Sequence, residues 1–299
     1  MARNPRLSGL FPATSTPFAK SGELDQSALA LVIERNVNQG AAGFFICGSA
    51  AECFLLTFEE RLRAMSVAAE AARGTALIAN ISALSVDEAL ALGRHAKCLG
   101  YDAVATTAPF FYRYNQRAIA EYLRALRAQL DMALMLYNFP VNTGVEIELH
   151  DPDMRAVFTD GTLAGVKHTS LNLLQLERMI RLSGDITVLS GTEECFLAGL
   201  ASGSHGAIGA TFGFTLPMFM DIKRAFDAGD LPRARAMQAR ANDLTDVMGR
   251  VGIIPAIKHA LRLSGIDCGA ARPPFLPLTE AQQDELEAAL NASGALDSY

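Results

Sequence analysis

Leu163-Ala164-Gly165-Val166-Lys167 is a short apolar run that ends in a lysine, and polar residues follow it directly. Such a run is typical of a buried strand, which would place Lys167 at the strand's carboxyl end. Lysine is among the residues least often buried without a partner. Desolvation disfavours the ammonium form and so lowers the pKa of a lysine in apolar surroundings. A neutral amine is a nucleophile that can form a Schiff base with a carbonyl group, so Lys167 is a candidate for chemistry.

Runs of the same kind recur along the chain. The run Ala133–Tyr137 also ends in a reactive side chain, the phenol of Tyr137. Because the runs are continuously apolar, they predict a sheet buried on both faces and therefore a parallel one. If both strands belong to one parallel barrel, Tyr137 and Lys167 open into the same mouth. The eight predicted strands are Gly9–Thr14, Gly43–Cys47, Ala76–Ile81, Ala103–Thr107, Ala133–Tyr137, Leu163–Lys167, Thr187–Ser190 and Gly206–Gly209.

Amphipathic stretches with helical spacing separate these strands. Thr57 with Glu60, and Ser85 with Glu88, have the spacing of a capping box at a helix start. Eight strands alternating with helices predict an α/β fold, a (β/α)8 TIM barrel, and a doubly wound open sheet is the competing prediction. The predicted helices are 25–39, 57–72, 85–99, 115–129, 151–158, 171–182 and 193–201, then 216–228, 231–251, 252–263 and 279–290.

The predicted strands end by about residue 212, and helical patterns fill the rest of the chain. We therefore predict a catalytic barrel over residues 1–215. Residues 216–299 are predicted to be a C-terminal helical appendix packed on that barrel, without an active site of its own.

Composition excludes several classes of protein. The chain has 299 residues, and 50% of them are apolar, so a substantial core is available. The net charge is -6 and no basic cluster stands out, which argues against a nucleic-acid partner. No apolar run approaches the ~20 residues that a membrane span needs, so we expect no membrane association. Met1–Ser8 lacks the apolar segment of a signal peptide.

The cysteines are odd in number, irregularly spaced and without a Cys-x-x-Cys pair. We therefore expect neither a disulfide framework nor a zinc site, and a reducing cytoplasm fits best. Each cysteine is predicted to be a small buried apolar residue. The five histidines are scattered as well, so we expect no structural or catalytic metal. The cysteines are Cys47, Cys53, Cys98, Cys195 and Cys268.

Active sites of (β/α)8 barrels lie at the carboxyl ends of the strands. The turn Gly48–Glu52 follows the second predicted strand, and Ser49 with backbone N–H groups can hold a carboxylate there. A phenol beside Lys167 can act as general acid or base in carbinolamine formation and C–C cleavage. These parts indicate a class I aldolase acting on a 2-oxo acid. The iminium is the electron sink, so we expect no metal and no cofactor.

Three motifs carry a resemblance to a known family, the dihydrodipicolinate synthase / N-acetylneuraminate lyase family. Gly48–Glu52 aligns with its pattern Gly-[Ser/Thr]-Thr-Gly-Glu. Tyr137–Pro140 followed by Gly144 matches Tyr-Asn-x-Pro followed by Gly, and Gly165–Lys167 matches the Schiff-base segment Gly-x-Lys. The resemblance runs from about residue 7 to residue 290. Each motif is weak alone, but three in order on an eightfold βα pattern are highly specific.

The resemblance implies a pyruvate-dependent enzyme with a covalent imine between pyruvate and Lys167. Tyr137 would be the proton-transferring phenol above the imine. Ser49 would be the hydroxyl that relays protons and binds the carboxylate. The family is usually a homotetramer built from pairs of tight dimers, so the same assembly is expected here.

Some positions depart from the family pattern. Ala50 replaces the usual second hydroxyl, so the carboxylate is expected to rely on Ser49 and backbone N–H groups. Ala51 replaces a glycine, which predicts a slightly different turn. Phe111 stands where many members carry a tyrosine that reaches into the neighbouring subunit's site, and the nearby tyrosines are out of register. These departures place the full relay of three hydroxyls in question.

The substrate is indicated by residues after the other strands. Dihydrodipicolinate synthases typically carry an arginine where this chain has Asn142, which cannot form a charged pair with the carboxylate of aspartate semialdehyde. Gly191–Glu194 resembles the Gly-Tyr-Asp-Glu of N-acetylneuraminate lyases, whose acidic pair binds sugar hydroxyls, and Thr169 fits that subgroup. Asn142 to Gly144 also resembles hydroxy-oxoglutarate aldolases. The predicted substrate-binding residues are Ala50, Asn142, Thr169, Gly191, Glu193 and Glu194.

Simpler structural roles stand beside these assignments. Ser49 can cap the following helix. Glu193 and Glu194 can be acids favoured by the dipole at a helix start. Phe111 is more simply explained by interface packing, and His168 by polar packing.

The predicted function is a lyase, a Schiff-base aldolase acting on pyruvate and a 2-keto-3-deoxy sugar acid, similar to N-acetylneuraminate lyase. The alternatives are a dihydrodipicolinate synthase and a keto-deoxy sugar acid dehydratase, because the same imine supports elimination. A non-catalytic protein that binds a 2-oxo acid is a further alternative, which Ala50, Ala51 and Phe111 suggest. Retention of both Lys167 and Tyr137 argues against it.

Overall fold

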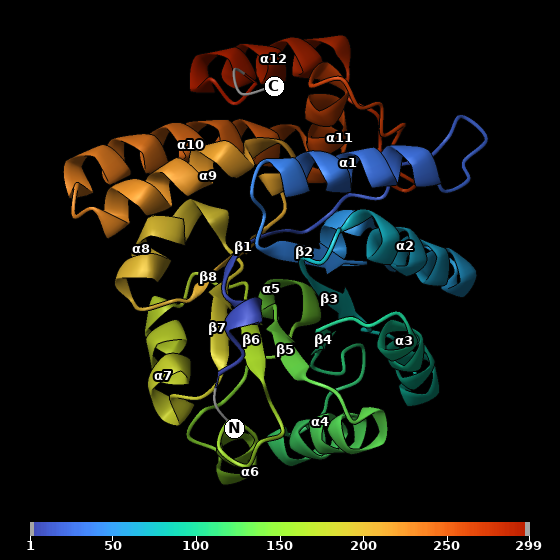
Figure 1. Cartoon of the computed structure of the whole chain (residues 1–299), viewed down its shortest axis with the longest axis vertical. Coiled ribbons are helices and arrows are strands. Elements are labelled where there is room, and N and C mark those ends of the chain that lie inside the picture. Colours follow the sequence, from blue (N-terminus) through green and yellow to red (C-terminus); the bar gives the residue numbers. More distant parts are fainter. Residues whose placement is uncertain (1–2, 297–299) are drawn as a thin grey trace. The chain divides into compact units, whose positions relative to one another are not determined.

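Strands and helices alternate along the chain, as Figure 1 shows. The computed structural model describes residues 3–296, apart from the side chain of Ser183. One sheet holds eight strands in the order β1-β8-β7-β6-β5-β4-β3-β2. They are β1 (Gly9–Pro12), β2 (Gly43–Ile46), β3 (Ala76–Asn80), β4 (Ala103–Thr107), β5 (Leu134–Asn138), β6 (Gly165–His168), β7 (Thr187–Ser190) and β8 (Gly206–Gly209). Every predicted strand is therefore confirmed, and β4, β7 and β8 have the predicted bounds.

Helices occupy the predicted connections. Between the strands lie α1 (Gln26–Asn38), α2 (Phe58–Ala71), α3 (Val86–Cys98), α4 (Gln116–Leu130), α6 (Pro152–Val157), α7 (Leu173–Ser183) and α8 (Phe196–Ala201). After β8 come α9 (Phe212–Asp227), α10 (Leu231–Val251), α11 (Ile253–Leu263) and α12 (Glu280–Ser293). The predicted start of α9 at Leu216 is wrong. Its first residues, Phe212 to Thr215, are all buried, so they show no amphipathic spacing.

Short helical turns escape the sequence patterns because one turn is too brief to show a period. They are η1 (Pro5–Leu7), η2 (Ser49–Ala51) and α5 (Pro140–Thr143), whereas η3 (Glu193–Cys195) lies at the start of the helix predicted over 193–201. Two of the predicted site motifs lie on such turns. Ser49 lies on η2, and the segment after Tyr137 forms α5, which begins with a proline at its first position.

The first of two compact units combines Met1–Gly9 with Ala76–Ile208. Within it, the strands from β3 to β7 pair in parallel with their neighbours. The register between β5 and β6 sets Tyr137 opposite Lys167 and Asn138 opposite His168. Every residue of these five strands is buried, which confirms a sheet covered on both faces.

The second compact unit combines Leu10–Thr75 with Gly209–Tyr299. In it α10 packs against α9 and α12, which Figure 1 shows in orange and red. The predicted boundary at residue 215 divides the chain into two continuous segments, whereas each compact unit combines two segments that are separate in the sequence. A single apolar core links α1 to the four C-terminal helices, and it includes Val32, Phe214, Leu244, Met248, Ile257, Leu261, Leu286 and Leu290.

The predicted capping box at α2 is confirmed. Thr57 Oγ1 accepts the N–H of Glu60 at 3.2 Å, and Glu60 Oε2 accepts the N–H of Thr57 at 2.8 Å. The side chain of Ser85 caps α3 by accepting the N–H of Glu88. These caps fix where two of the long helices begin.

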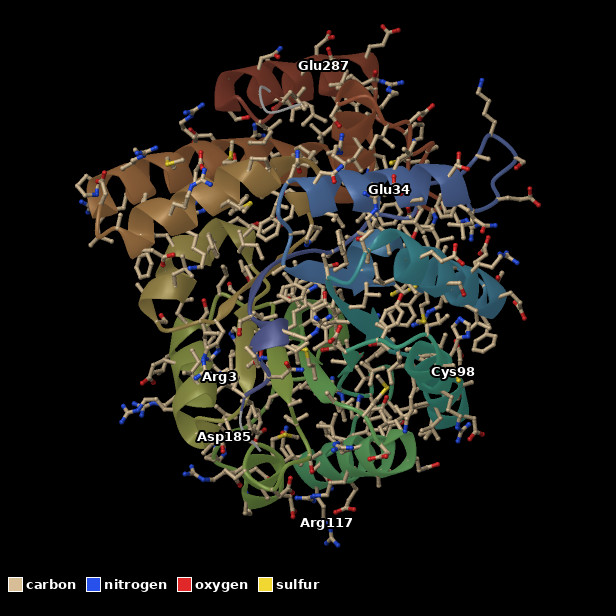
Figure 2. All side chains as sticks on the ribbon, in the orientation of Figure 1. Arg3, Glu34, Cys98, Arg117, Asp185 and Glu287 are labelled. Carbon is tan, nitrogen blue, oxygen red and sulfur yellow. The ribbon has the colours of Figure 1, made fainter. Side chains whose placement is uncertain are left out.

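The cysteines are all thiols, and three of them, Cys47, Cys53 and Cys268, are buried as predicted. Burial raises the pKa of Cys47 and of Cys268 to about 12, so both are inert. The prediction is wrong for Cys98, which ends α3 on its solvent side and is exposed (Figure 2), and Cys195 is only partly buried. Within residues 3–296, no cluster of three His, Cys, Asp or Glu side chains is arranged to hold a metal ion. No helix in the same range is long and apolar enough to cross a membrane.

Gly165 supplies a test of the strand packing beneath Lys167. A Cβ there would lie 2.6 Å from the carbonyl oxygen of Thr187 on β7. We expect Gly165→Ala to push β6 away from β7 and lower the free energy of unfolding by about 1–3 kcal/mol. Urea denaturation measures this. The matched control is Gly249→Ala on α10, where an added Cβ would meet no atom within 4 Å beyond the backbone of its own helical turn and alanine should stabilise the helix by roughly 0.5–1 kcal/mol. Equal stability of Gly165→Ala and wild type would contradict the packing described.

Candidate active site

Lys167 and Tyr137 lie side by side on neighbouring strands. Their Cα atoms are register partners, and Lys167 Nζ lies 4.2 Å from the centroid of the Tyr137 ring. Both residues are almost fully enclosed, with 4% and 3% of their surface exposed. The Tyr137 ring stacks in turn on Phe139, with centroids 5.4 Å apart. Lys167 is the last residue but one of β6 rather than its end, because His168 still pairs with Asn138.

This arrangement joins a nucleophile to a proton carrier. An amine can attack a carbonyl carbon, and a phenol beside it can give or take a proton as the bonds change. Enclosure of both side chains limits the access of bulk water to an imine formed there. The pair therefore has the parts that an imine-forming aldolase needs.

A row of polar side chains ties the ends of β5 and β6 together. Asn138 Nδ2 lies 3.0 Å from His168 Nδ1 and donates to Gln175 Oε1 at 3.0 Å. Gln175 Nε2 donates to the carbonyl oxygen of Ile147 at 2.8 Å. At the other end, His168 Nε2 lies 3.1 Å from the carbonyl oxygen of Asn172. The row thus runs between two backbone carbonyls, which can only accept hydrogen bonds.

These two fixed acceptors determine the protonation of His168. Because the carbonyl of Asn172 accepts, we infer that Nε2 carries the hydrogen and that Nδ1 accepts from Asn138. A second proton would set donor against donor at Nδ1. If the amides of Asn138 and Gln175 were both reversed, Asn138 Oδ1 could accept from a protonated Nδ1. The amide oxygen of Gln175 would then face the carbonyl oxygen of Ile147, and two acceptors cannot bond each other. Burial lowers the pKa of His168, which favours the same neutral form.

Thr169 and Gly191 follow β6 and β7 and lie against each other. Gly191 N donates to the carbonyl oxygen of His168 at 2.7 Å, and Thr169 N donates to that of Asn138 at 2.8 Å. A Cβ on Gly191 would lie 2.0 Å from Thr169 Oγ1, so only glycine leaves room for this hydroxyl. Thr169 Oγ1 is buried and makes no hydrogen bond within residues 3–296, so it can bond to a ligand.

The other predicted residues of the first unit lie on the segments after β5 and β7. Glu193 opens η3 and is buried, whereas Glu194 next to it is exposed. Asn142 lies on α5 and is exposed. Because β5, β6 and β7 are parallel neighbours, these segments lie at the same edge of the sheet as the end of β6.

Ser49 and Ala50 belong to the second unit, in the turn after β2. Ser49 is exposed and Ala50 is buried. The left-handed residue that ends the turn is Glu52, with φ 58°, so Ala51 needs no glycine conformation. Thr57 caps α2, so Ser49 is not the cap of that helix.

Two residues of the site escaped the sequence patterns. Asn138 stands inside the motif Tyr-Asn-x-Pro, but no role followed from its position. Gln175 lies on α7 outside any motif, and only its contact with Asn138 connects it to the site. The one available signal was an amide directly after the tyrosine that the sequence predicts to be catalytic.

The sequence matches the model of the Dihydrodipicolinate synthetase family over residues 6–293. The chain belongs to this family. It is 33% identical over 287 residues to an N-acetylneuraminate lyase of Rhizobium meliloti (strain 1021), with 95% of each chain covered. The predicted family is therefore confirmed. The predicted class of enzyme, a lyase similar to N-acetylneuraminate lyase, is confirmed by this similarity along 95% of the chain.

Solved structures agree with the fold. The chain matches a Ruminococcus gnavus sialic acid aldolase, a catalytic lysine mutant, with a TM-score of 0.94 at 24% identity, covering 100% of this chain and 99% of that one. It matches CdNal from Clostridium difficile in complex with mannosamine with a TM-score of 0.91 at 26% identity, covering 95% and 98%. The predicted (β/α)8 barrel with C-terminal helices is confirmed.

The neutral state of His168 leads us to expect that the free energy of unfolding depends on pH. The unfolded chain takes up a proton near pH 6.5, the ordinary pKa of histidine, whereas folded His168 resists it. The unfolded state then binds more protons, so the free energy of unfolding should fall as the pH drops from 7 to 5. Urea denaturation at both pH values should show a smaller fall in His168→Asn.

His150 is exposed and provides the matched control. The variant His150→Asn should show the same fall in the free energy of unfolding between pH 7 and 5 as wild type. Part of the fall should remain in His168→Asn, because burial also lowers the pKa of His205. An identical fall in wild type and His168→Asn would show that the row of hydrogen bonds does not fix the charge of His168.

Proposed function

We propose that this protein cleaves a 2-keto-3-deoxy sugar acid to pyruvate and an aldehyde through a Schiff base at Lys167. The observation that carries the proposal is the contact between the Lys167 amine and the Tyr137 ring on paired strand positions. The N-acetylneuraminate lyase of Rhizobium meliloti, similar along nearly the whole chain, supports the class of reaction. Sialic acid itself is the first substrate to test.

The proposed reaction begins with attack of Lys167 Nζ on the C2 carbonyl carbon of the substrate. Loss of water from the carbinolamine gives an iminium. Tyr137 takes the proton of the C4 hydroxyl while the C3–C4 bond breaks, and the bond's electrons flow into the iminium to leave an enamine. Protonation at C3 and hydrolysis release pyruvate and regenerate the Lys167 amine. No cofactor enters these steps.

The carboxylate of the 2-oxo acid is assigned to the Gly48–Glu52 turn. The hydroxyl of Ser49 and backbone N–H groups of the turn supply donors. Ala50 supplies no hydroxyl, and its side chain is buried.

The sugar chain is assigned to the segments after β5, β6 and β7. The buried Thr169 hydroxyl and the carboxylates of Glu193 and Glu194 can bond several hydroxyl groups, and Gly191 leaves space beside them. Asn142 carries no charge, so it offers no strong partner to a second carboxylate. This set favours a polyhydroxylated substrate over aspartate semialdehyde. The Clostridium difficile structure holds mannosamine, an amino sugar, which agrees with this choice.

We further propose a homotetramer, a dimer of dimers, in the cytoplasm. Large apolar side chains crowd the surface after β3 to β6, which supports contact with another copy. Phe111 is 81% exposed, and Tyr112 contacts its ring edge to face. The thiol state of all five cysteines fits a reducing compartment. Light scattering tests the assembly.

The phenol of Tyr137 has a specific test. In Tyr137→Phe the imine should still form, because Lys167 is intact, but kcat should fall by about 10²–10⁴-fold with the loss of the proton carrier. Stopped assays of pyruvate release from sialic acid or from 2-keto-3-deoxy sugar acids measure kcat. Tyr101→Phe, a buried tyrosine outside the site, is the control and should keep wild-type activity. Unchanged kcat in Tyr137→Phe would remove Tyr137 from the mechanism.

The choice of substrate has its own test. Wild type should release pyruvate from sialic acid or from a 2-keto-3-deoxy sugar acid, and Lys167→Ala should release none. Turnover of pyruvate with aspartate semialdehyde alone would favour the dihydrodipicolinate synthase alternative. Loss of water without C–C cleavage would favour the dehydratase. A folded protein that binds pyruvate and turns over none of these would favour the non-catalytic alternative.

A further inference from the structure

The turn that carries Ser49 is flanked by strained backbone. Cys47 before it and Glu52 at its end both have φ of 58°, in the left-handed region that residues with a side chain seldom adopt. Such conformations persist only where the surroundings enforce them. The contacts of the second unit show what enforces the conformation here.

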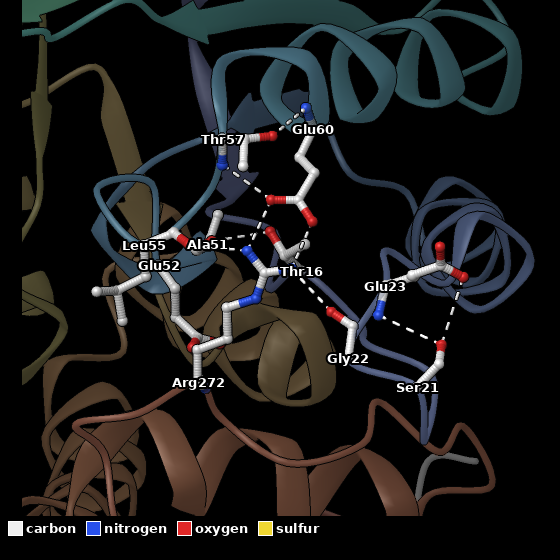
Figure 3. A network of polar contacts seen from close by, with 10 residues as sticks. All are labelled: Thr16, Ser21, Gly22, Glu23, Ala51, Glu52, Leu55, Thr57, Glu60 and Arg272. Carbon is white, nitrogen blue, oxygen red and sulfur yellow. Dashed lines mark hydrogen bonds and ion pairs between the residues drawn. The ribbon is translucent and has the colours of Figure 1, made fainter.

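Glu52 is tied by both carboxylate oxygens to a segment more than two hundred residues further along the chain. Its Oε1 lies 2.7 Å from Lys258 Nζ, and its Oε2 accepts the N–H of Arg272 at 2.6 Å. The Glu52 side chain is fully buried. The hydroxyl of Thr16 adds a third tie, since it donates to the carbonyl oxygen of Ala51 at 2.8 Å (Figure 3). The turn is thus fixed from outside at its last two residues.

Lys258 is a buried charge that the proposed reaction does not use. It lies on α11 with 2% of its side chain exposed, donates to the carbonyl oxygen of Ala270 at 3.1 Å, and stands 4.0 Å from the centroid of the Phe18 ring. Desolvation lowers the pKa of Lys258, and the carboxylate of Glu52 opposes that shift. Within this enclosure Glu52 is its ionic partner.

Arg272 fixes the segment that leads from the turn into α2. Its guanidinium donates to the carbonyl oxygens of Leu55 and Gly22, each at 2.8 Å, and forms a two-pronged ion pair with Glu60 (Figure 3). Glu60 is also the partner of Thr57 in the capping box of α2. Hydrogen bonding to Arg272 lowers the pKa of Glu60 to about 2, so the pair stays charged at neutral pH. The turn and the start of α2 therefore share one anchor.

Stability alone does not explain these ionic contacts. A buried ion pair loses much of its attraction to the desolvation of two charges, and apolar side chains of similar size often stabilise a fold equally well. Hydrogen bonds and ion pairs are directional, so unlike apolar contacts they fix the position of each bonded group. In this unit they act on Glu52, the last residue of the Gly48–Glu52 turn.

We propose that the Lys258 side chain and the backbone N–H of Arg272, acting through Glu52, are positioning groups that hold the Gly48–Glu52 turn ready for the carboxylate of the 2-oxo acid. The proposal rests on the proposed function, which assigns that carboxylate to the turn. Neither residue takes part in the steps of the proposed reaction. The contacts of Lys258 and Arg272 with Glu52 are therefore expected to increase the affinity for pyruvate and to have little effect on the rate at saturating substrate.

The double variant Glu52→Gln/Lys258→Met tests the proposal, since it removes both charges and nearly keeps the volume. Removing Lys258 alone would leave a buried unpaired carboxylate and endanger the fold. The measurement is the pyruvate concentration that gives half-maximal adduct after borohydride reduction, by intact mass. We expect it to rise at least roughly ten-fold, as for a misplaced binding group, with the melting temperature close to that of wild type.

The matched control removes an exposed ion pair of the same unit. Arg250 Nη2 and Glu285 Oε1 lie 2.8 Å apart on α10 and α12, and both side chains are about half exposed. Arg250→Met/Glu285→Gln should bind pyruvate as wild type does, because surface pairs contribute little.

A folded Glu52→Gln/Lys258→Met variant with wild-type affinity for pyruvate would overturn the proposal. If that variant does not fold, Glu52→Gln/Lys258→Gln decides, because it removes the same ionic contact, leaves no buried charge unpaired and keeps two side chains that can hydrogen-bond. Weaker pyruvate binding in this folded variant supports the proposal, and wild-type binding overturns it. Absence of any adduct in wild type would instead defeat the proposed function, and the positioning role with it.

Discussion

The parallel register of β5 and β6 is the constraint on which the rest of the site depends. It sets Tyr137 opposite Lys167, so a phenol and an amine meet in an enclosed space although thirty residues separate them in the chain. A shift of one residue would turn either side chain to the opposite face of the sheet. Gly165 permits this register, because the backbone of β7 passes where any larger residue would place its Cβ.

The buried polar side chains near this pair and in the second unit fix the positions of other groups more than they stabilise the fold. The row from Ile147 to Asn172 through Gln175, Asn138 and His168 ends on carbonyl acceptors, so its polarity has one solution. In the second unit, Lys258 and the backbone N–H of Arg272 bond Glu52, the last residue of the Gly48–Glu52 turn. In both places hydrogen bonds or ion pairs join buried polar side chains to groups on other elements, and such contacts restrict the positions of the bonded groups.

Much of this could be predicted from the sequence, for a physical reason. Parallel strands buried on both faces are continuous apolar runs, so all eight were visible, and the motifs at their ends led to Tyr137, Lys167 and the family. What escaped depends on contacts between distant residues. One-turn elements such as α5 and η2 have no period, and the solvent side of Cys98 follows from helix packing. Gln175 and Lys258 look like ordinary helix residues until the fold brings them to Asn138 and Glu52. The substrate roles of Ser49, Ala50, Asn142, Thr169, Gly191, Glu193 and Glu194 remain predictions.

The central claim is that Lys167 forms the imine. The most direct test is incubation with pyruvate and borohydride, followed by proteolysis and peptide mass spectrometry. The account predicts one reduced pyruvyl adduct, on the peptide that contains Lys167, and none in Lys167→Ala. An adduct on another lysine such as Lys258, or no adduct in the folded wild-type protein, would contradict it.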